Sequence, residues 1–215
     1  MIISAAIFDL NGTILSDEDE YGKAFARVLK QFDIDEVDDI PHIAGIGVEE
    51  NWPKLIEKYG IKTEKTPLEL AKETQEAYED MIDEITLQDG IVEFINDLKE
   101  SGVKVALATS NNWEIVDKVF EKFGFEGLFD AVTTGEEVEF KKPDPDIFIL
   151  TSKKLDIDPE NCLVFEDADA GVEAAHRAGM KVVGIARKSG EETLEEADIT
   201  IESFKEMSPE LIAEI

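Results

Sequence analysis

Short apolar runs alternate with amphipathic stretches along most of the chain. The apolar runs have strand length and predict strands at residues 2–8, 103–108, 131–133, 162–165, 181–185 and, more weakly, 199–201. The stretches between them predict helices at residues 91–100, 114–123, 146–155 and 169–178, and a last helix opened by Ser208-Pro209. Strand and helix therefore alternate from residue 89 onward, which predicts an α/β fold: a doubly wound parallel sheet with helices on both faces.

The segment between residues 17 and 86 breaks this alternation, because it has helical periodicity only. Helices are predicted at residues 21–32, 48–59 and 68–85, and Thr66-Pro67-Leu68-Glu69 has the form of a capping box. The first strand can pair only with strands that arrive after residue 102. We therefore predict a core of residues 1–15 and 87–215, and a small all-helical cap of residues 16–86 inserted after the first strand.

Four polar segments follow predicted strands, where ligands bind in doubly wound sheets. They are Asp9-Leu10-Asn11-Gly12-Thr13, Thr109-Ser110-Asn111-Asn112, Lys141-Lys142-Pro143 and Glu166-Asp167. Carboxylates are ligands for a hard divalent cation, and lysine and hydroxyl groups bind phosphate oxygens. The sequence therefore predicts a site for a phosphoryl group and a cation.

These four motifs, in this order, resemble those of the haloacid dehalogenase superfamily of phosphohydrolases. Over the whole chain the sequence is most similar to the β-phosphoglucomutase-like subgroup, which has a Rossmann-like core and a helical cap. The resemblance implies that Asp9 is the nucleophile and forms an aspartyl phosphate, which water then hydrolyses. It also implies Mg²⁺ as cofactor, held by Asp9, the main-chain carbonyl of Asn11 and Asp167, with Glu166 as a ligand or an outer partner.

The resemblance further implies which groups stabilise the phosphoryl oxygens. Thr109 and Lys142 are the expected catalytic partners of Asp9, and Gly12, Ser110 and Asn111 are the expected phosphate-binding positions. The implied reaction is the Mg²⁺-dependent hydrolysis of a small phosphate monoester.

Asn11 departs from the family pattern, because family phosphatases carry a second aspartate there as general acid and base. An amide cannot transfer that proton, a function worth roughly 10²–10⁴-fold in rate. We therefore expect low turnover, unless a carboxylate of Asp17, Glu18 or Asp19 substitutes. One alternative is a phosphate-binding protein without turnover. Another is a metal-independent dehalogenase, against which the acidic pair of Glu166 and Asp167 argues.

The cap departs from the subgroup in a second way. Tyr21 falls near the position of a subgroup histidine, and Glu50 falls near that of an arginine that grips a second phosphate. The acidic start of the cap should repel a bisphosphorylated sugar. We therefore expect a small monophosphate or a polyol phosphate as substrate. His42 and His176 have no ligand cluster nearby and are predicted to be structural or surface residues.

The composition of the chain limits the partners that the protein can bind. The chain of 215 residues has 21 Lys and Arg against 51 Asp and Glu, a formal net charge of −30. Such a chain repels nucleic acid and anionic membrane surfaces, and no apolar run approaches the ~20 residues of a spanning helix. The acidity fits either a high-salt habitat or a solubilised surface. A single cysteine, Cys162, excludes an intrachain disulfide. We expect a cytoplasmic monomer whose partner is a small phosphorylated metabolite.

Overall fold

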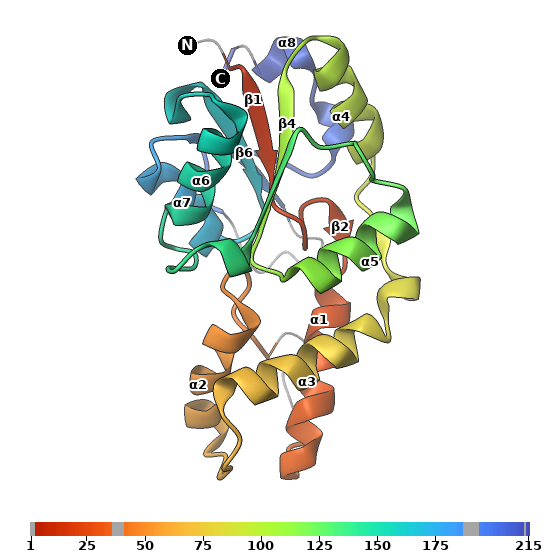
Figure 1. The fold of residues 1–215 in the computed structure, drawn as a ribbon, viewed down its shortest axis with the longest axis vertical. Helices are drawn as coiled ribbons and strands as arrows, with labels where there is room; N and C mark the ends of the chain where they lie inside the picture. The colour runs from red at the N-terminus through yellow and green to blue at the C-terminus, as the bar shows by residue number, and fades with distance from the viewer. Residues whose placement is uncertain (1–2, 36–40, 187–193, 213) are drawn as a thin grey trace.

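The core is a six-stranded parallel sheet (Figure 1). The computed structural model describes residues 3–35, 41–186, 194–212 and 214–215, so residue 2, the first of the first predicted strand, lies outside the described part. The strands, given in their order across the sheet, are β5 (Ala131–Thr134), β4 (Lys104–Thr109), β1 (Ala5–Phe8), β6 (Cys162–Glu166), β7 (Lys181–Ile185) and β8 (Ile199–Ile201). The predicted doubly wound α/β sheet is confirmed.

Helices cover both faces of this sheet, as Figure 1 shows. They are α4 (Ile91–Glu100), α5 (Trp113–Phe123), α6 (Asp146–Leu155), α7 (Asp169–Arg177) and the short α8 (Pro209–Ile212), with 3₁₀ turns at Gly135–Glu137, Pro159–Asn161 and Phe204–Glu206. Alternate residues of β1 pack on opposite faces. Phe8 belongs to the apolar cluster that contains α4 and α5, and Ile7 to the cluster that contains α6 and α7.

The cap consists of three helices below the core in Figure 1. They are α1 (Glu18–Leu29), α2 (Val48–Tyr59) and α3 (Pro67–Glu79), with 3₁₀ turns at Lys30–Phe32 and Ile82–Glu84. The third predicted helix is shorter than residues 68–85, since the chain leaves the helix after Glu79. Trp52 is fully buried in the cap and donates from Nε1 to Thr74 Oγ1 at 3.1 Å.

Two short strands connect cap and core. Strand β2 (Leu15–Ser16) leads into the cap, strand β3 (Thr86–Leu87) leads out, and the two pair antiparallel. Two lysines of α5 also connect the core to the cap. Lys118 forms an ion pair with Glu79, and Lys122 donates to the carbonyl oxygens of Ile82 and Ile85, both at 2.5 Å. The cap is thus held against the carboxyl ends of the strands.

Helix capping follows the sequence at two positions and differs at a third. Thr66 and Glu69 form the predicted capping box, and Asn112 Oδ1 accepts from the Ile115 amide to cap α5. The dipeptide Asp144-Pro145 predicts an N-cap at Asp144 followed by proline at the first helical position, and this prediction is wrong. The N-cap is Pro145, one residue later, because the Asp144 amide instead donates to the Lys141 carbonyl in a turn.

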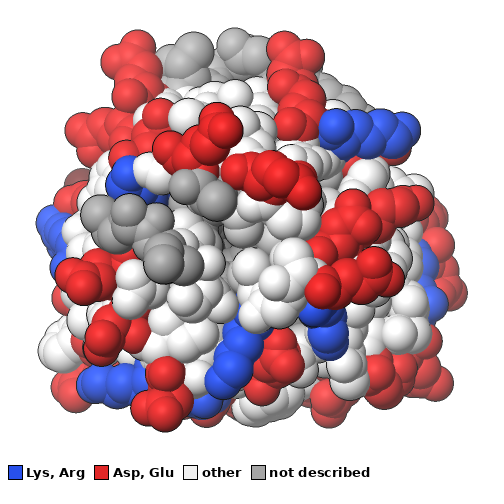
Figure 2. Space-filling view, turned by 90° about the horizontal axis from the view of Figure 1, so that it is seen from above, with Lys and Arg blue, Asp and Glu red and all other residues white. Residues whose placement is uncertain are grey.

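The surface reflects the composition. Figure 2 looks onto the end of the core opposite the cap and shows Asp and Glu over much of that face, with Lys and Arg scattered among them. No helix in the described ranges is both long and apolar enough to cross a membrane.

Candidate active site

The polar segments at the strand ends meet at the edge of the sheet that faces the cap. Strand β1 lies between β4 and β6, so Asp9 follows the strand at which the strand order reverses. Thr109 ends β4 and Glu166 ends β6. The arrow of β1 in Figure 1 points toward the cap. This is the place where open α/β sheets bind their ligands.

Lys142 is buried between two carboxylates. Its Nζ lies 2.6 Å from Asp9 Oδ1 and 2.5 Å from Glu166 Oε1, and the side chain is 1% exposed. The Nζ also lies 5.1 Å from the ring centre of Phe148, on α6. Burial alone would lower the pKa of Lys142, but the two carboxylates outweigh it and raise that pKa above its usual range. Lys142 is therefore a fixed positive charge at Asp9.

Asp9 combines burial with this charge. Burial raises its pKa from 3.8 to about 7; the charge of Lys142 opposes the rise, and the neighbouring Glu166 adds to it. Lys142 occupies Oδ1, and Oδ2 accepts no hydrogen bond from any residue in the described part of the chain. Asp9 also lines the pocket between core and cap. One oxygen of the expected nucleophile is thus held, and the other is available.

Glu166 serves Lys142 rather than the pocket. One of its oxygens accepts from Lys142, and the other accepts from the main-chain amides of Asp167 and Ala168, at 2.9 and 3.0 Å. The side chain is fully buried and is not part of the pocket lining. Both oxygens therefore have partners already. This geometry favours an outer, lysine-orienting position over direct metal ligation.

The turn after Asp9 brings the chain close to Asp167. Gly12 has φ of 73°, and a Cβ built there would lie 2.0 Å from Asp167 Oδ2, so no side chain fits. Thr13 Oγ1 lies 3.5 Å from the other oxygen, Asp167 Oδ1. Glycine at position 12 is what lets the Asp167 carboxylate reach the nucleophile loop.

The residues present fit a hard cation such as Mg²⁺. Asp9, Asp167 and the Asn11-Gly12 turn line one pocket wall and offer carboxylate and carbonyl oxygens, the donors this ion prefers. Within the described ranges, no group of three or more His, Cys, Asp or Glu gathers as a metal cluster. A metal site here would therefore use two carboxylates, those of Asp9 and Asp167, and a main-chain oxygen. Glu166 would not be a third side-chain ligand, because it is turned toward Lys142.

The segment after β4 supplies hydroxyl and amide groups. Thr109 Oγ1 accepts from both the main-chain amide and the side-chain Nδ2 of Asn111, each at 3.2 Å. Ser110 and Asn111 line the pocket, whereas Thr109 is not among its described lining residues and is 1% exposed. Ser110 Oγ donates to the Gly45 carbonyl of the cap at 3.2 Å. All three predicted phosphate-binding positions, Gly12, Ser110 and Asn111, therefore line the pocket.

Asn11 is held at both ends of its amide. Its Nδ2 donates to Asp17 Oδ2 and also lies 3.1 Å from Tyr78 Oη, while its Oδ1 accepts from Asn111 Nδ2 at 2.5 Å. Asn11 lines the pocket, and its donors serve Asp17 and Tyr78, because a buried carboxylate six residues on takes them up.

Asp17, in the acidic run, reaches the site. It is fully buried and accepts from the Gly12 amide at 2.9 Å and from Tyr78 Oη at 2.5 Å. Burial raises its pKa, while the hydrogen bonds from Tyr78 and Asn11 oppose the rise. The side chains of Glu18 and Asp19 lie outside the described part. Among the carboxylates that could substitute for the missing general acid and base, Asp17 is described, and it lines the pocket.

Two cap tyrosines complete this network. Tyr21 and Tyr78 stack with their ring centres 3.9 Å apart, and Tyr21 Oη donates to Asn111 Oδ1 at 2.6 Å. Burial raises the pKa of both phenols well above the usual value, so both remain hydroxyl donors. Sequence reasoning missed Tyr78. Its helical spacing marked it only as an apolar position of α3, and its contact with Asp17 spans 61 residues.

Replacing Lys142 by alanine should lower kcat/KM by roughly 10²–10³-fold, the usual loss for one charge-stabilising donor. Stability should fall as well, because Glu166 would keep a buried charge without its cation, a change that costs about 3–5 kcal/mol in comparable pairs. The Lys142→Met, Glu166→Gln double variant helps to separate the two effects, since it removes the Glu166 charge and leaves Asp9 as the one carboxylate of this contact that has lost its cation. Thermal melts of this variant should lie closer to the parent while its activity stays lost; retained activity would contradict the assignment.

Comparison with known proteins agrees with this geometry. The profile of the haloacid dehalogenase-like hydrolases matches residues 6–185 of the chain. The protein therefore belongs to the haloacid dehalogenase-like hydrolase family. With its helical cap, it falls among the β-phosphoglucomutase and CbbY-like members.

Individual relatives point the same way. The chain is 31% identical over 182 residues to a phosphorylated carbohydrates phosphatase of Thermotoga maritima, covering 83% of each protein. It is 30% identical to the β-phosphoglucomutase of Bacillus subtilis, covering 99% of this chain and 95% of that protein. Among solved structures, the β-phosphoglucomutase of Clostridium difficile superposes with a TM-score of 0.86 at 28% identity, covering 100% of this chain and 96% of that one. CbbY of Rhodobacter sphaeroides in complex with phosphate gives 0.84 at 26% identity, covering 95% and 96%.

Proposed function

We propose that this protein is a Mg²⁺-dependent phosphohydrolase that cleaves a small phosphate monoester through an aspartyl phosphate on Asp9. The observation that carries the proposal is the state of the Asp9 carboxylate. Its Oδ1 is held 2.6 Å from the Lys142 ammonium, and the residue faces a pocket lined by the predicted phosphate-binding positions. A fixed carboxylate beside a cation is suited to attack phosphorus.

The proposed reaction has two displacements. In the first, Asp9 attacks phosphorus, an Asp9–phosphorus bond forms through a carboxylate oxygen, the bond to the alcohol oxygen breaks, and that oxygen takes up a proton as the alcohol leaves. In the second, water attacks the aspartyl phosphate, gives up a proton, and releases inorganic phosphate and the free carboxylate. Lys142, together with the Ser110 and Asn111 segment, would balance the charge on the phosphoryl oxygens in both steps. Mg²⁺, held by Asp9, Asp167 and the Asn11 carbonyl, would supply further positive charge to those oxygens.

The names of the relatives support phosphatase chemistry on phosphorylated metabolites. They include the phosphorylated carbohydrates phosphatase and a fructose-1-phosphate phosphatase of Escherichia coli, which is 30% identical over 83% of this chain. A dehalogenase would not need the Asp167 carboxylate beside Asp9. Measuring chloride release from a 2-chloroalkanoate alongside phosphate release separates the two activities.

Asn11 is the reason for a second candidate function, in which the protein binds phosphate with little turnover. The amide has no proton to give, and its hydrogen bonds to Asp17 and Asn111 hold it in place. Esters with poor leaving groups, which need protonation, should therefore react much more slowly than acetyl phosphate or aryl phosphates. A tight Mg²⁺-dependent complex with phosphate, but no hydrolysis of any ester, would favour this candidate.

Removing the metal should abolish phosphatase activity. With EDTA in excess, hydrolysis of 4-nitrophenyl phosphate should fall to background, and added Mg²⁺ should restore it, because Asp9 and Asp167 offer the oxygen ligands of a hard cation. The matched control is Asp167→Asn, which should require much higher Mg²⁺ for half-maximal activity. If the rate of hydrolysis is undiminished in excess EDTA, the metal assignment is wrong and the proposed reaction is wrong with it.

A further inference from the structure

Beyond Asp17 and Tyr21, the wall that the cap contributes to the pocket is mostly apolar. Its described members are Phe25, His42, Ile43, Ala44, Gly45, Ile46, Val48 and Asn51. The lining as described contains no lysine and no arginine, and its carboxylates come from Asp9, Asp17 and Asp167 rather than from this wall. An ester bound at Asp9 would therefore direct its alcohol portion toward an apolar and largely uncharged surface.

The side-chain amide of Asn51 in this wall is already engaged. Asn51 Oδ1 accepts from the Ile43 amide at 2.8 Å, and its Nδ2 lies 3.1 Å from the carbonyl oxygens of both Ile43 and Gly47. The Gly45 carbonyl accepts from Ser110 Oγ. The amide of Asn51 thus fixes the loop and has few hydrogen bonds left to offer. Hydroxyl groups of a ligand placed here would lose their water without full replacement, which is unfavourable.

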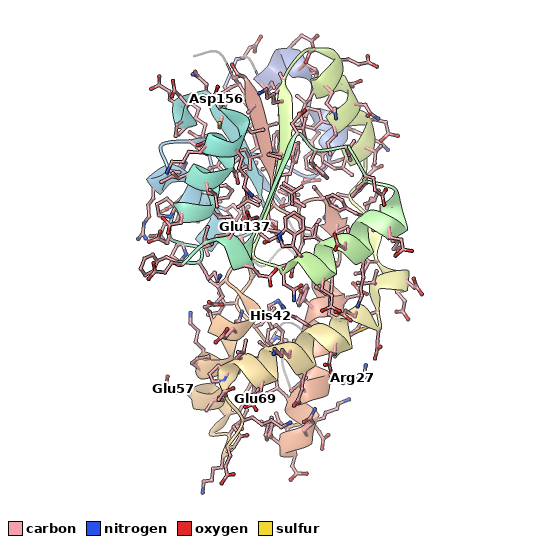
Figure 3. The ribbon with its side chains drawn as sticks, viewed as in Figure 1. Arg27, His42, Glu57, Glu69, Glu137 and Asp156 are labelled. Carbon is pink, nitrogen blue, oxygen red and sulfur yellow. The ribbon has the colours of Figure 1, made fainter. Side chains whose placement is uncertain are left out.

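His42 is the one titratable side chain among the described members of this wall. Its ring stacks on Phe25 with centres 4.7 Å apart and planes 18° apart, and Phe25 in turn lies 5.8 Å from Trp52. In Figure 3, His42 lies on the side of the cap that faces the core, whereas Arg27, Glu57 and Glu69 lie farther from the core. The charged cap residues labelled there are thus remote from the pocket, and His42 presents an aromatic surface.

The groove beside the pocket does not add a free cation. Glu50 lies there, with its Oε2 only 2.0 Å from where a Cβ of Gly47 would stand. Lys141 donates to the Gly135 and Val138 carbonyl oxygens, and Arg177 pairs with Glu173 and lies 3.3 Å from the Pro143 carbonyl. The cations described in this groove are therefore already engaged, and Glu50 adds a negative charge beside them.

We propose that the alcohol portion of the substrate is small, uncharged and largely apolar, so that this enzyme hydrolyses alkyl-type phosphate monoesters in preference to polyol phosphates, carboxylated phosphates or bisphosphates. This inference rests on the proposed function and narrows the substrate class expected from the sequence. The enclosed volume of about 70 Å³ is far below the 300–1,000 Å³ of sites for drug-sized ligands, in keeping with a small alcohol.

Binding of non-hydrolysable phosphonates tests the proposal independently of leaving-group chemistry. Calorimetry at saturating Mg²⁺ would compare inorganic phosphate, butylphosphonate, 3,4-dihydroxybutylphosphonate and 4-phosphonobutanoate. Butylphosphonate should bind tightest, by about tenfold to a hundredfold over the diol, the range by which an apolar pocket discriminates against added hydroxyls. The carboxylated compound should bind at least as weakly as the diol. A diol or carboxylate that binds as tightly as butylphosphonate overturns the inference.

The same experiment separates this inference from the proposed function. If inorganic phosphate binds in Mg²⁺ but the butyl chain adds no affinity, the phosphohydrolase assignment stands and the apolar subsite is wrong. If inorganic phosphate itself does not bind, the proposed function is wrong, and the substrate class falls with it.

A matched pair of variants places the effect on this wall. Ile43 is 47% exposed and lines the pocket, so Ile43→Lys introduces a cation there with little folding cost. It should tighten 4-phosphonobutanoate about tenfold or more and leave butylphosphonate unchanged or weaker. Leu68→Lys, at 50% exposure on α3 and outside the pocket lining, adds the same charge to the cap and should change neither. Equal effects of the two variants would contradict the assignment.

Discussion

Replacing Asp9 by asparagine should abolish phosphate-ester hydrolysis and leave no covalent phosphate on the protein. The variant loses the attacking oxygen and one expected metal ligand, while Lys142 keeps Glu166 as partner at 2.5 Å. Acid-quenched samples from acetyl phosphate carrying labelled phosphorus would show the acyl phosphate in the parent and none in Asp9→Asn. The control is Asp156→Asn, because Asp156 lies at the far end of the core in Figure 3 and has φ of 57°, which asparagine tolerates. Detection of an acyl phosphate in Asp9→Asn would place the nucleophile elsewhere.

The same substitution should change how stability depends on pH in the metal-free protein. Burial raises the pKa of Asp9 from 3.8 to about 7, so between these values the folded state holds more protons at this carboxyl than the unfolded state does. Stability from this group is therefore present below about pH 4 and is lost as pH rises toward 7. In EDTA, thermal melts of Asp9→Asn should decline less between pH 5 and 8 than those of the parent. An equal or steeper decline would contradict this account of Asp9.

Replacing Asn11 by aspartate should raise turnover on alkyl and sugar phosphates by roughly 10²–10⁴-fold, the usual worth of a positioned acid and base. The new carboxyl would stand beside the buried Asp17, and two adjacent carboxylates cannot both ionise without penalty, so the pair should retain a proton at neutral pH. That proton would be available to the leaving oxygen. The gain on 4-nitrophenyl phosphate should be much smaller, because its leaving group needs little protonation.

Two controls make this result interpretable. Asn11→Ala removes the amide without adding an acid and should give no gain. Asp17→Asn in the parent background tests whether Asp17 already transfers a proton, and in that case the parent should lose most of its activity on poor leaving groups. Rapid hydrolysis of such an ester by the parent, unaffected by Asp17→Asn, would refute this view of both residues.

The sequence predicted those parts of the site that depend on short spacing and strand order. Asp9, Lys142 and Asp167 each follow a strand or open a helix, and parallel pairing brings such ends together regardless of side-chain detail. Direction of individual side chains was harder to predict. Glu166 turns to Lys142 because the main-chain amides that follow it take its second oxygen. That contact depends on local loop geometry, which strand order does not specify.

The cap contribution was predicted least well. Apolar periodicity placed Tyr78 on a helix, but its hydroxyl contact with Asp17 depends on how α3 packs over the core. His42 was expected to be structural or on the surface, and it lines the pocket against Phe25. Both positions require the tertiary arrangement of two separate layers. The acidic run did signal that one of its carboxylates could reach the site, and Asp17 is buried there.

The paired strands β2 and β3 also make the cap an exchangeable module. Because Ser16 lies opposite Thr86, the entry and exit of the cap are antiparallel neighbours, whose Cα atoms stand about 4.5–5.5 Å apart. A tight turn could join them, and a cap from a relative could be grafted there without stretching the core. Such an exchange would keep Asp9, Lys142 and Glu166 intact, since all three belong to the core. It would remove Asp17 together with Tyr78, so a replacement cap would have to bring its own acceptor for the Gly12 amide of the core.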